Sequence, residues 1–115
     1  TKPEIVVRQL AHRLGYRFRL HRRDLPGTPD LVFPGRHKVI LVHGCFWHQH
    51  GCKLGRRRPQ TRREYWGPKL DGNVARDREA RRQLAGLGWG VLVIWECEVH
   101  DIPALGARLT SFLHS

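Results

Sequence analysis

Two cysteines and three histidines lie within ten residues, in the stretch HGCFWHQHGC from His43 to Cys52. Thiolate sulfur and imidazole nitrogen are the ligands that Zn²⁺ prefers in proteins. Cys45, His50 and Cys52 of this stretch, together with Cys97 at the end of a later apolar segment, make a set of three thiolates and one imidazole. Four protein ligands leave no position for a water molecule, so the pattern predicts a structural zinc site.

The alternative explanation is that these cysteines are ordinary buried residues, which is a common role for a free cysteine. Three cysteines cannot complete a disulfide framework, and two of them share a loop with a histidine. The zinc interpretation uses every cysteine in the chain, and we prefer it. A bound zinc ion would order an irregular loop that a small core could not order alone.

A second set of residues has the chemistry of metal-assisted hydrolysis. Asp30 begins the apolar segment DLVF, and Val42 and His43 end the next one, KVILVH. If these segments form a hairpin, both positions lie at the same edge of the sheet, where the Asp30 carboxylate and the Val42 carbonyl can hold Mg²⁺. His43 and His48 are then available to deprotonate a water molecule and to assist the leaving oxygen.

Each of these side chains also has an ordinary explanation. Aspartate after proline is common in turns, and histidine is common on the surface of a basic protein. The prediction of a catalytic site therefore depends on Asp30, His43 and His48 converging beside a basic surface.

The chain is strongly basic, with 21 lysines and arginines against 10 acidic residues and a net charge of +11. One explanation is a solvated face that keeps the protein soluble. We favour a polyanion-binding surface, because each neutralised phosphate releases counterions and adds affinity. No apolar run is long enough to span a membrane, no secretory signal is visible, and no basic helix has a clean apolar face. We expect a cytoplasmic, nucleoid-associated protein that binds nucleic acid.

The hydrophobic pattern predicts the elements that must position these residues. Helical spacing covers residues 4–14, an alternating segment covers 16–20, and residues 30–33 and 38–43 read as a hairpin joined by PGRH. Residues 44–59 have no periodicity and form the loop that carries the cysteines and histidines. Residues 61–86 predict a long helix, with interruptions expected near Gly67-Pro68 and Gly72.

The last part of the chain predicts a strand at residues 89–99 and a closing helix at 102–113. The strand is almost continuously apolar, so we expect it in the centre of the sheet. A strand, a long helix and a strand in succession imply a parallel pair within a mixed sheet. The fold class we predict is α/β, a three-layer arrangement of one mixed sheet flanked by helices, in one domain of 115 residues.

Four blocks of the sequence, PGTPDLVF, VHGCFWHQHGC, TRREYWGPKLDGNVARD and LGWGVLVIWECEV, resemble successive motifs of the very short patch repair (Vsr) endonucleases. The resemblance covers nearly the whole chain, from KPE near the start to WEC near the end. It implies that residues 1–115 are a single Vsr-like endonuclease domain with a fold related to the PD-(D/E)xK restriction endonucleases. Members of that family nick DNA 5′ of the mismatched thymine at T:G mispairs, which arise when 5-methylcytosine deaminates.

The same resemblance implies roles for individual residues. Asp30 matches the aspartate that binds Mg²⁺, His48 the proposed general base, His43 the second active-site histidine, and Glu4 a glutamate that supports the metal-water network. The four zinc ligands of the family match the four residues named above. Val42 stands where the best-known members carry threonine, and a ligand that acts through its main-chain carbonyl survives this change.

The resemblance further implies a DNA-binding surface. Phe46 and Trp47 match side chains that wedge between base pairs beside the mismatch, with Trp66 nearby, and Lys69 and Asn73 match positions that face the mismatch and the backbone. Unstacking a mispair costs less than unstacking a matched pair, so a wedge itself discriminates. The alternative is that both aromatic residues are core residues beneath the loop. We expect five arginines to follow phosphates, unless they are simply solvated: Arg56, Arg57, Arg58, Arg62 and Arg63.

We therefore expect a monomeric, Mg²⁺-dependent nicking endonuclease with a structural zinc ion, whose partner is duplex DNA carrying a T:G mismatch. The resemblance adds mismatch-repair factors as partners. The segment with which family members clamp DNA would precede Thr1, which leaves the breadth of recognition open. The alternatives are a mismatch nickase of relaxed specificity, a zinc-stapled DNA-binding module without catalysis, and a zinc-only hydrolase. Pure binding needs no catalytic histidines, and a zinc ion with four protein ligands has no site for water.

Overall fold

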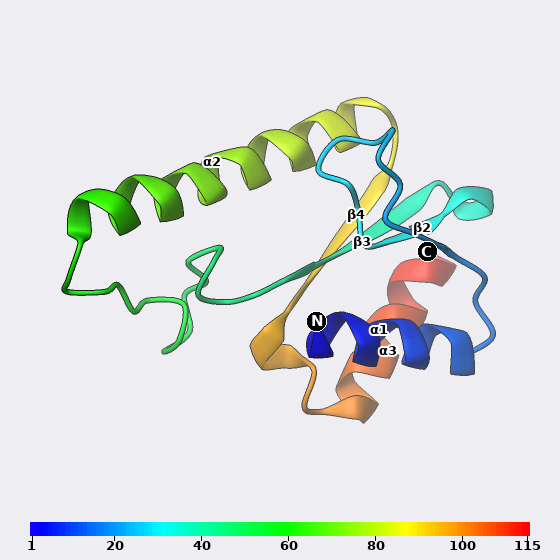
Figure 1. Cartoon of the computed structure of the whole chain (residues 1–115). Coiled ribbons are helices and arrows are strands. Elements are labelled where there is room, and N and C mark those ends of the chain that lie inside the picture. Colours follow the sequence, from blue (N-terminus) through cyan, green and yellow to red (C-terminus); the bar gives the residue numbers. More distant parts are fainter.

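The order of helices and strands follows the hydrophobic pattern closely. A computed structural model describes all residues, 1–115, and Figure 1 shows their arrangement. The elements are α1 (Lys2–Arg13), β1 (Arg19–Leu20), β2 (Leu31–Phe33), β3 (Lys38–His43), α2 (Arg63–Gly86), β4 (Gly90–Trp95) and α3 (Ile102–His114), with short 3-10 helices at Pro34–Arg36 and Glu96–Glu98.

The four strands form one mixed sheet in the order β1-β2-β3-β4. β1, β2 and β3 pair in antiparallel fashion, with Leu31 opposite Ile40, whereas β3 and β4 run parallel, with His43 opposite Trp95. The hairpin and the parallel pair are therefore confirmed. Residues that follow β3 and β4 emerge at the same end of the sheet, because parallel strands end on the same side.

Alternation along the strands builds two separate cores. Leu31, Phe33, Ile40 and Ile94 face α1 and α3, and this larger core includes apolar side chains of both helices. The intervening residues, such as Val32 and Val39, pack with Leu84 of α2 on the opposite face. Helices thus cover both faces of the sheet, and the predicted three-layer α/β arrangement is confirmed (Figure 1).

The structure corrects the expected position of the last strand. β4 lies at an edge of the sheet and not in its centre. Its apolar sequence comes from helix packing on both faces, since Leu92 packs toward α1 and α3 while Val91 packs toward α2. A continuously apolar strand has both of its faces covered by other elements, but it need not have a neighbouring strand on each side. β1 is also shorter than expected, with only Arg19 and Leu20 in the ladder.

The long helix α2 is continuous through Pro68 and Gly72, so the expected interruptions are absent. Its C-terminal half packs on the sheet, and its N-terminal half extends past the sheet toward the loop that follows β3 (Figure 1). The loop between β1 and β2 also reaches α2, and Gly27, with a φ of +74°, permits this approach because an added Cβ would lie 2.8 Å from the Ala80 Cβ. None of the helices combines the length and apolar character that crossing a membrane requires.

Candidate active site and metal centre

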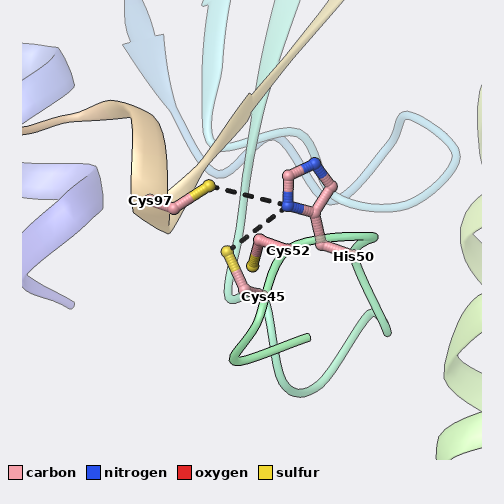
Figure 2. A group of neighbouring side chains, drawn as sticks. All are labelled: Cys45, His50, Cys52 and Cys97. Atoms are coloured by element: carbon pink, nitrogen blue, oxygen red, sulfur yellow. Dashed lines mark hydrogen bonds between the residues drawn. The ribbon is translucent and has the colours of Figure 1, made fainter. Parts of the chain in front are cut away.

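The three cysteines and one histidine predicted as zinc ligands lie together. Cys45, His50 and Cys52 come from the loop after β3, and Cys97 comes from the 3-10 helix after β4, so the parallel strands deliver both segments to one place (Figure 2). Their four ligand atoms all lie within 4.8 Å of one another. The structure thus brings Cys97 back to the loop, as the sequence predicted.

The spacing of these atoms suits a tetrahedral zinc ion. Zn–S and Zn–N bonds of about 2.3 and 2.0–2.1 Å at a tetrahedral angle place sulfur and nitrogen about 3.6 Å apart. The His50 Nδ1 lies 3.6 Å from the Cys97 Sγ and 3.8 Å from the Cys45 Sγ. The donor set therefore fits Zn²⁺ in both chemistry and distance.

Neighbouring groups hold the cluster in this geometry. The His50 ring stacks on Trp95, with ring centroids 4.2 Å apart. The Cys45 N–H donates to the Glu96 Oε1 at 3.2 Å, which ties the loop to the turn that carries Cys97. Gly55 packs so closely on the loop that an added Cβ would lie 2.0 Å from the His50 carbonyl oxygen. The backbone around the cluster is therefore specified by its contacts.

The surroundings of Cys45 and Cys52 shift the pKa values of their thiols in opposite directions. Burial raises the pKa of Cys45 to about 12. The Gly55 N–H, which donates to the Cys52 Sγ at 3.4 Å, and a hydrogen bond with His50 lower the pKa of Cys52 to about 6. Three thiolates crowded together repel one another, and a dication is the charge that would stabilise them.

A carboxylate cluster lies at the end of the sheet near α1. Glu4 of α1, His21 and Asp30 bring their ligand atoms within 4.8 Å of one another. The His21 Nε2 lies 3.0 Å from both Glu4 carboxylate oxygens and 3.9 Å from the Asp30 Oδ1. Two carboxylates beside one imidazole make a site that can accept a hard cation such as Mg²⁺.

Asp30 and Val42 meet as the hairpin prediction requires. The Val42 N–H donates to the Asp30 Oδ2 at 2.7 Å. In an extended strand the N–H and the carbonyl of one residue point to the same side, so the Val42 carbonyl faces the Asp30 side of β3. A carboxylate oxygen and a main-chain carbonyl oxygen thus lie on one edge, which is the donor set proposed from the sequence.

The electrostatics of this cluster favour an added cation. Burial raises the pKa of Asp30, and the neighbouring charge of Glu4 raises it further. The Val42 N–H and the charges of His21 and His43 act in the opposite direction without reversing the shift. Ionising Asp30 beside Glu4 is less favourable than ionising it in water, and a divalent cation bound there would offset this cost.

His43 and His48 form a stacked pair on the α2 side of the sheet. Their ring centroids lie 3.9 Å apart with an interplanar angle of 7°. The His43 Nε2 lies 3.0 Å from the Asp77 Oδ1, and the Asp77 Oδ2 lies 3.2 Å from Arg81. The Nδ1 atoms of both histidines are buried and lack a hydrogen-bond partner within the protein. One imidazole is therefore fixed by a carboxylate, while the second stacks on it.

The His48 imidazole is neutral at physiological pH. Burial lowers its pKa to about 4, and the charge of His43 lowers it further, against the opposing effect of Asp77. A neutral imidazole can accept a proton. The three predicted residues thus occupy two neighbouring groups: Asp30 with Glu4 and His21, and the histidine pair with Asp77.

The aromatic residues of the loop are gathered beside the start of α2. Trp47 is 45% exposed, so it is not a core residue beneath the loop. Phe46 and Trp66 each lie within 6 Å of Trp47, centroid to centroid, and Tyr65 adds a further exposed ring. We refer to Phe46, Trp47, Tyr65 and Trp66 as the aromatic cluster. Its rings present flat surfaces outside the candidate zinc site and the carboxylate cluster.

Residues of α2 hold this cluster in place. The Asn73 side-chain amide donates to the Trp47 carbonyl at 3.2 Å and accepts from Arg76 at 2.6 Å. The Lys69 ammonium lies 6.0 Å from the Trp47 ring and 5.6 Å from the Tyr65 ring. Both residues predicted on the helix therefore lie at the base of the cluster.

The five predicted arginines are exposed but not equally free. Arg58 donates to Gln49 at 2.8 Å and to Asp71 at 2.6 Å, which links the loop to α2. Arg62 lies over the Tyr65 ring, and Arg63 donates to Gln60. Arg56 and Arg57 have no side-chain partner and are the freest to contact phosphates.

Sequence reasoning missed two residues of these groups. Asp77 lies in the middle of the predicted long helix, where an aspartate suggests only solvent exposure, yet its side chain is 9% exposed and bound to His43. His21 lies in a basic loop and has a left-handed φ of +49°. The block TRREYWGPKLDGNVARD contains Asp77, so the pattern offered a signal for that residue, whereas His21 carries no signal beyond its proximity to Asp30.

Comparisons with known proteins agree with this geometry. The family model described as DNA mismatch endonuclease Vsr matches residues 1–54. That segment contains the carboxylate cluster, the histidine pair and three of the four candidate zinc ligands.

Several relatives align with most of the chain. The type II nicking enzyme V.XorIIP of Xanthomonas oryzae pv. oryzae is 57% identical over 113 residues, which cover 98% of this chain and 82% of that protein. DNA mismatch endonuclease Vsr of Escherichia coli is 44% identical over 100 residues, 84% of this chain and 64% of that protein. The type II nicking enzyme V.NaeI of Lentzea aerocolonigenes is 43% identical over 119 aligned positions, 99% of this chain and 69% of that protein.

Proposed function

Because the chain belongs to the Vsr family of DNA mismatch endonucleases, we propose that it is a DNA endonuclease that nicks one strand 5′ of the mismatched thymine at T:G mispairs. The reaction is a Mg²⁺-dependent hydrolysis of a phosphodiester bond. We infer also that the fold is nuclease-like and related to the PD-(D/E)xK enzymes, with the catalytic carboxylates at one end of the mixed sheet.

One observation carries the proposal. The Asp30 carboxylate, bonded at 2.7 Å to the Val42 N–H, and the stacked His43–His48 pair come together around the end of a single strand, β3. A structural protein or a binding module has no need of a candidate cation site beside a stacked pair of imidazoles. Phosphodiester hydrolysis needs both, since charge develops on the phosphate and a water molecule must lose a proton.

The residues of the chain divide the reaction between them. Asp30 and the Val42 carbonyl would hold Mg²⁺, and Glu4, within the same cluster, would bind water on that ion. Bound Mg²⁺ supplies Lewis-acid stabilisation of the negative charge on the phosphate. His48 is neutral and accepts the proton of the attacking water. His43, whose Nε2 is held by Asp77, would use its remaining ring nitrogen, Nδ1, to hydrogen-bond the phosphate or the leaving oxygen.

The aromatic cluster explains how a mismatch would be selected. Phe46 and Trp47 would wedge between base pairs with Trp66 beside them, and Asn73 and Lys69 would support Trp47 from α2. A T:G mispair stacks less firmly than a matched pair, so insertion there requires less free energy. Arg56, Arg57, Arg58, Arg62 and Arg63 would neutralise phosphates beside the wedge.

Zinc bound to the four-residue cluster would act structurally. Cys45 and Cys52 flank Phe46, Trp47 and His48 in the chain, so fixing the thiolates fixes the wedge and the general base together. The Cys₃His set supplies all four ligands of a tetrahedral ion and leaves no position for a reacting water.

A nicking assay tests the proposal. Otherwise identical duplexes carrying T:G, another mispair or no mispair are incubated with the protein, with and without added Mg²⁺. We expect a single nick 5′ of the mismatched thymine, only in the T:G duplex and only with Mg²⁺. Omitting Mg²⁺ is preferable to adding a chelator, because a chelator would also remove zinc. Equal nicking of every mispair would retain the chemistry and replace the narrow specificity with a relaxed one.

The Asp30→Asn variant separates catalysis from binding. It should retain binding to the T:G duplex and lose nicking by roughly 100-fold or more, since it removes a ligand of a catalytic metal. Asp24→Asn is the matched control, because Asp24 lies in the same loop region and is paired only with Arg22. Binding by the wild-type protein with no nick on any duplex would support a zinc-stapled DNA-binding module instead.

A further inference from the structure

A basic groove outside the described site runs between α1 and the segment that follows it. Arg8, His12 and Arg13 of α1 line one part of this groove together with Phe18. At His12 and Phe18 it continues into a wider hollow whose walls include Arg17 and Arg19. We refer to the two connected parts as the α1–β1 groove.

The groove lies next to the carboxylate cluster, although no residue of that cluster lines it. Arg8 lies one helical turn after Glu4, and His12 lies one turn further along the same face of α1. On the opposite wall, Leu20 precedes His21, whose ring lies 3.0 Å from the Glu4 carboxylate. The two elements that form the walls are therefore joined just beyond the groove by the contact between His21 and Glu4, beside the residues that would hold Mg²⁺.

The charge of the groove is entirely positive. No acidic residue lines either part of it. The exposed residues Arg13, Arg17 and Arg19 have no ion-pair partner, and Arg8 has only a distant one, the Glu4 carboxylate at 3.8 Å. Arg36, at the far end, is already used because it donates to the Leu113 carbonyl at 2.8 Å. Several unpaired guanidinium groups in a row are an arrangement that a polyanion would neutralise.

We propose that the α1–β1 groove binds the phosphate backbone of the DNA arm on one side of the nicked phosphate. The inference rests on the proposed function, since it takes the scissile phosphate to lie at Asp30 and Glu4. From Glu4 to His12 the helix rises about 12 Å, which matches the axial rise of three to four nucleotides of one strand. The aromatic cluster and its arginines contact the mismatch, so the groove gives the enzyme a second grip on the duplex.

Duplex DNA is the occupant that the groove favours over an acidic protein segment. A bound protein segment would be recognised largely through apolar anchors, whereas the only large apolar side chains open to the narrow part are Phe18 and Leu20. A DNA strand that enters the carboxylate cluster must also leave it, and the groove is a basic surface next to that cluster. The guanidinium groups contact phosphates without reading sequence.

The test combines a protein variant with shortened DNA. Binding of T:G duplexes is measured without added Mg²⁺ over a range of salt concentrations, for a full duplex and for duplexes shortened to about three base pairs on one side or on the other. The variant Arg13→Gln/Arg19→Gln removes two charges of the groove. The control variant Arg78→Gln/Arg82→Gln removes two charges from exposed positions of α2, with Arg78 on the face opposite Lys69 and Asn73.

For the groove variant we expect a 10- to 100-fold loss of affinity at about 0.1 M salt and a salt dependence less steep by about two units. Shortening one arm should weaken binding by the wild-type protein to a similar degree and should have little further effect on the variant. Shortening the other arm should weaken both proteins equally. The control variant should bind as the wild-type protein does.

Two results would overturn the inference. One is equal loss of affinity in the groove and control variants, which would mean that only net charge matters. The other is unchanged dependence on arm length in the groove variant. Unfolding curves of all variants exclude a general loss of structure. The nicking assay is independent of this test: failure of the wild-type protein to nick would count against the proposed function, while a groove-dependent arm effect would still establish the DNA contact.

Discussion

Asp77 connects the long helix α2 to β3 through one side chain. It is almost fully buried, and it hydrogen-bonds His43 and pairs with Arg81. Burial opposes its ionisation, but the hydrogen bond with His43 and the charges of His43 and Arg81 outweigh burial and lower the pKa of Asp77 below its usual value. A carboxylate held in this way stabilises the fold and orients the imidazole at once.

The Asp77→Asn variant should be less stable than the wild-type protein by about 1–3 kcal/mol at pH 7, because a buried charge-assisted hydrogen bond is lost. A carboxylate whose pKa is lowered by folding stabilises the folded state at pH values above its pKa in the unfolded chain. This stabilisation is lost as the pH falls through its pKa in the folded protein. The difference between the two proteins should therefore persist from pH 7 to about 5 and shrink below about pH 4. Urea unfolding at several pH values measures it, with the exposed Asp71→Asn variant as control. A difference that is the same at pH 3 and pH 7 would contradict this account.

Gly55 makes the loop that carries the candidate zinc ligands sensitive to a single methyl group. Replacing it with alanine would place a Cβ 2.0 Å from the His50 carbonyl oxygen, so the backbone beside the ligand must move. We expect Gly55→Ala to reduce bound zinc well below one ion per chain, as measured by elemental analysis of the purified protein. Gly51→Ala is the matched control, since an added Cβ there meets nothing within 4 Å. Equal zinc contents in the two variants would mean that the loop adjusts freely.

β4 is an edge strand, and the two residues of an ion pair bind main-chain groups on its outer side. The Glu98 carboxylate accepts from the Trp95 N–H at 2.8 Å, and Arg108 of α3 donates to the Val93 carbonyl at 3.4 Å. Glu98 and Arg108 also pair with each other at 3.0 Å. Two main-chain groups that would otherwise offer themselves to another strand are thereby occupied, a common defence of exposed sheet edges.

Removing this ion pair should promote self-association of the protein. In the Glu98→Ala/Arg108→Ala variant the Trp95 N–H and the Val93 carbonyl are free on an apolar strand, so we expect the average mass in sedimentation velocity to rise with protein concentration more than it does for the wild-type protein. The Glu79→Ala/Arg82→Ala variant removes an exposed ion pair on α2 and should sediment as the wild-type protein does. A mass that stays constant with concentration in the first variant would show that helix packing alone protects the edge.

The elements themselves were largely predictable from periodicity, and the errors have specific causes. The hairpin from Leu31 to His43 and the parallel return of β4 followed from apolar segments and their connections. The edge position of β4 did not, because burial by helices on both faces produces the same apolar run as burial by strands. Pro68 did not break α2, since only one helical hydrogen bond is lost near the first turns of a long helix.

The candidate site was predictable to the extent that its ligands share a loop or a hairpin. Cys45, His50 and Cys52 lie close together in the sequence, and Asp30 meets Val42 through pairing of adjacent strands. Cys97 could be placed beside them because β3 and β4 run parallel and end on the same side. The pairing of Asp77 with His43 depends on how α2 crosses the sheet, which hydrophobic spacing does not specify to the nearest side chain.

The molecule consists of a body that contains the apolar cores and an extension that has almost no buried apolar residues of its own. The body is the sheet with α1, α3 and the second half of α2, which together contain nearly all of the buried apolar residues. The extension consists of residues 44–62 and the start of α2, where only Cys45 and Gly55 of the loop are fully buried. Every residue proposed to wedge into DNA lies in this extension. Its order would come from a zinc ion bound by the four-residue cluster and from polar contacts such as that of Arg58 with Asp71.

Removing zinc should therefore loosen the extension while leaving the body folded. We expect a zinc chelator to accelerate trypsin cleavage after Arg56, Arg57 and Arg62 by roughly tenfold or more, because a structural zinc site contributes several kcal/mol to local order. Cleavage after Arg78 and Arg82, in the part of α2 that packs on the sheet, should change little and serves as a control within the same digest. Mass spectrometry of timed samples measures both rates. Equal acceleration at all sites would mean that the whole domain depends on zinc, and no acceleration would mean that the polar ties are sufficient to order the loop.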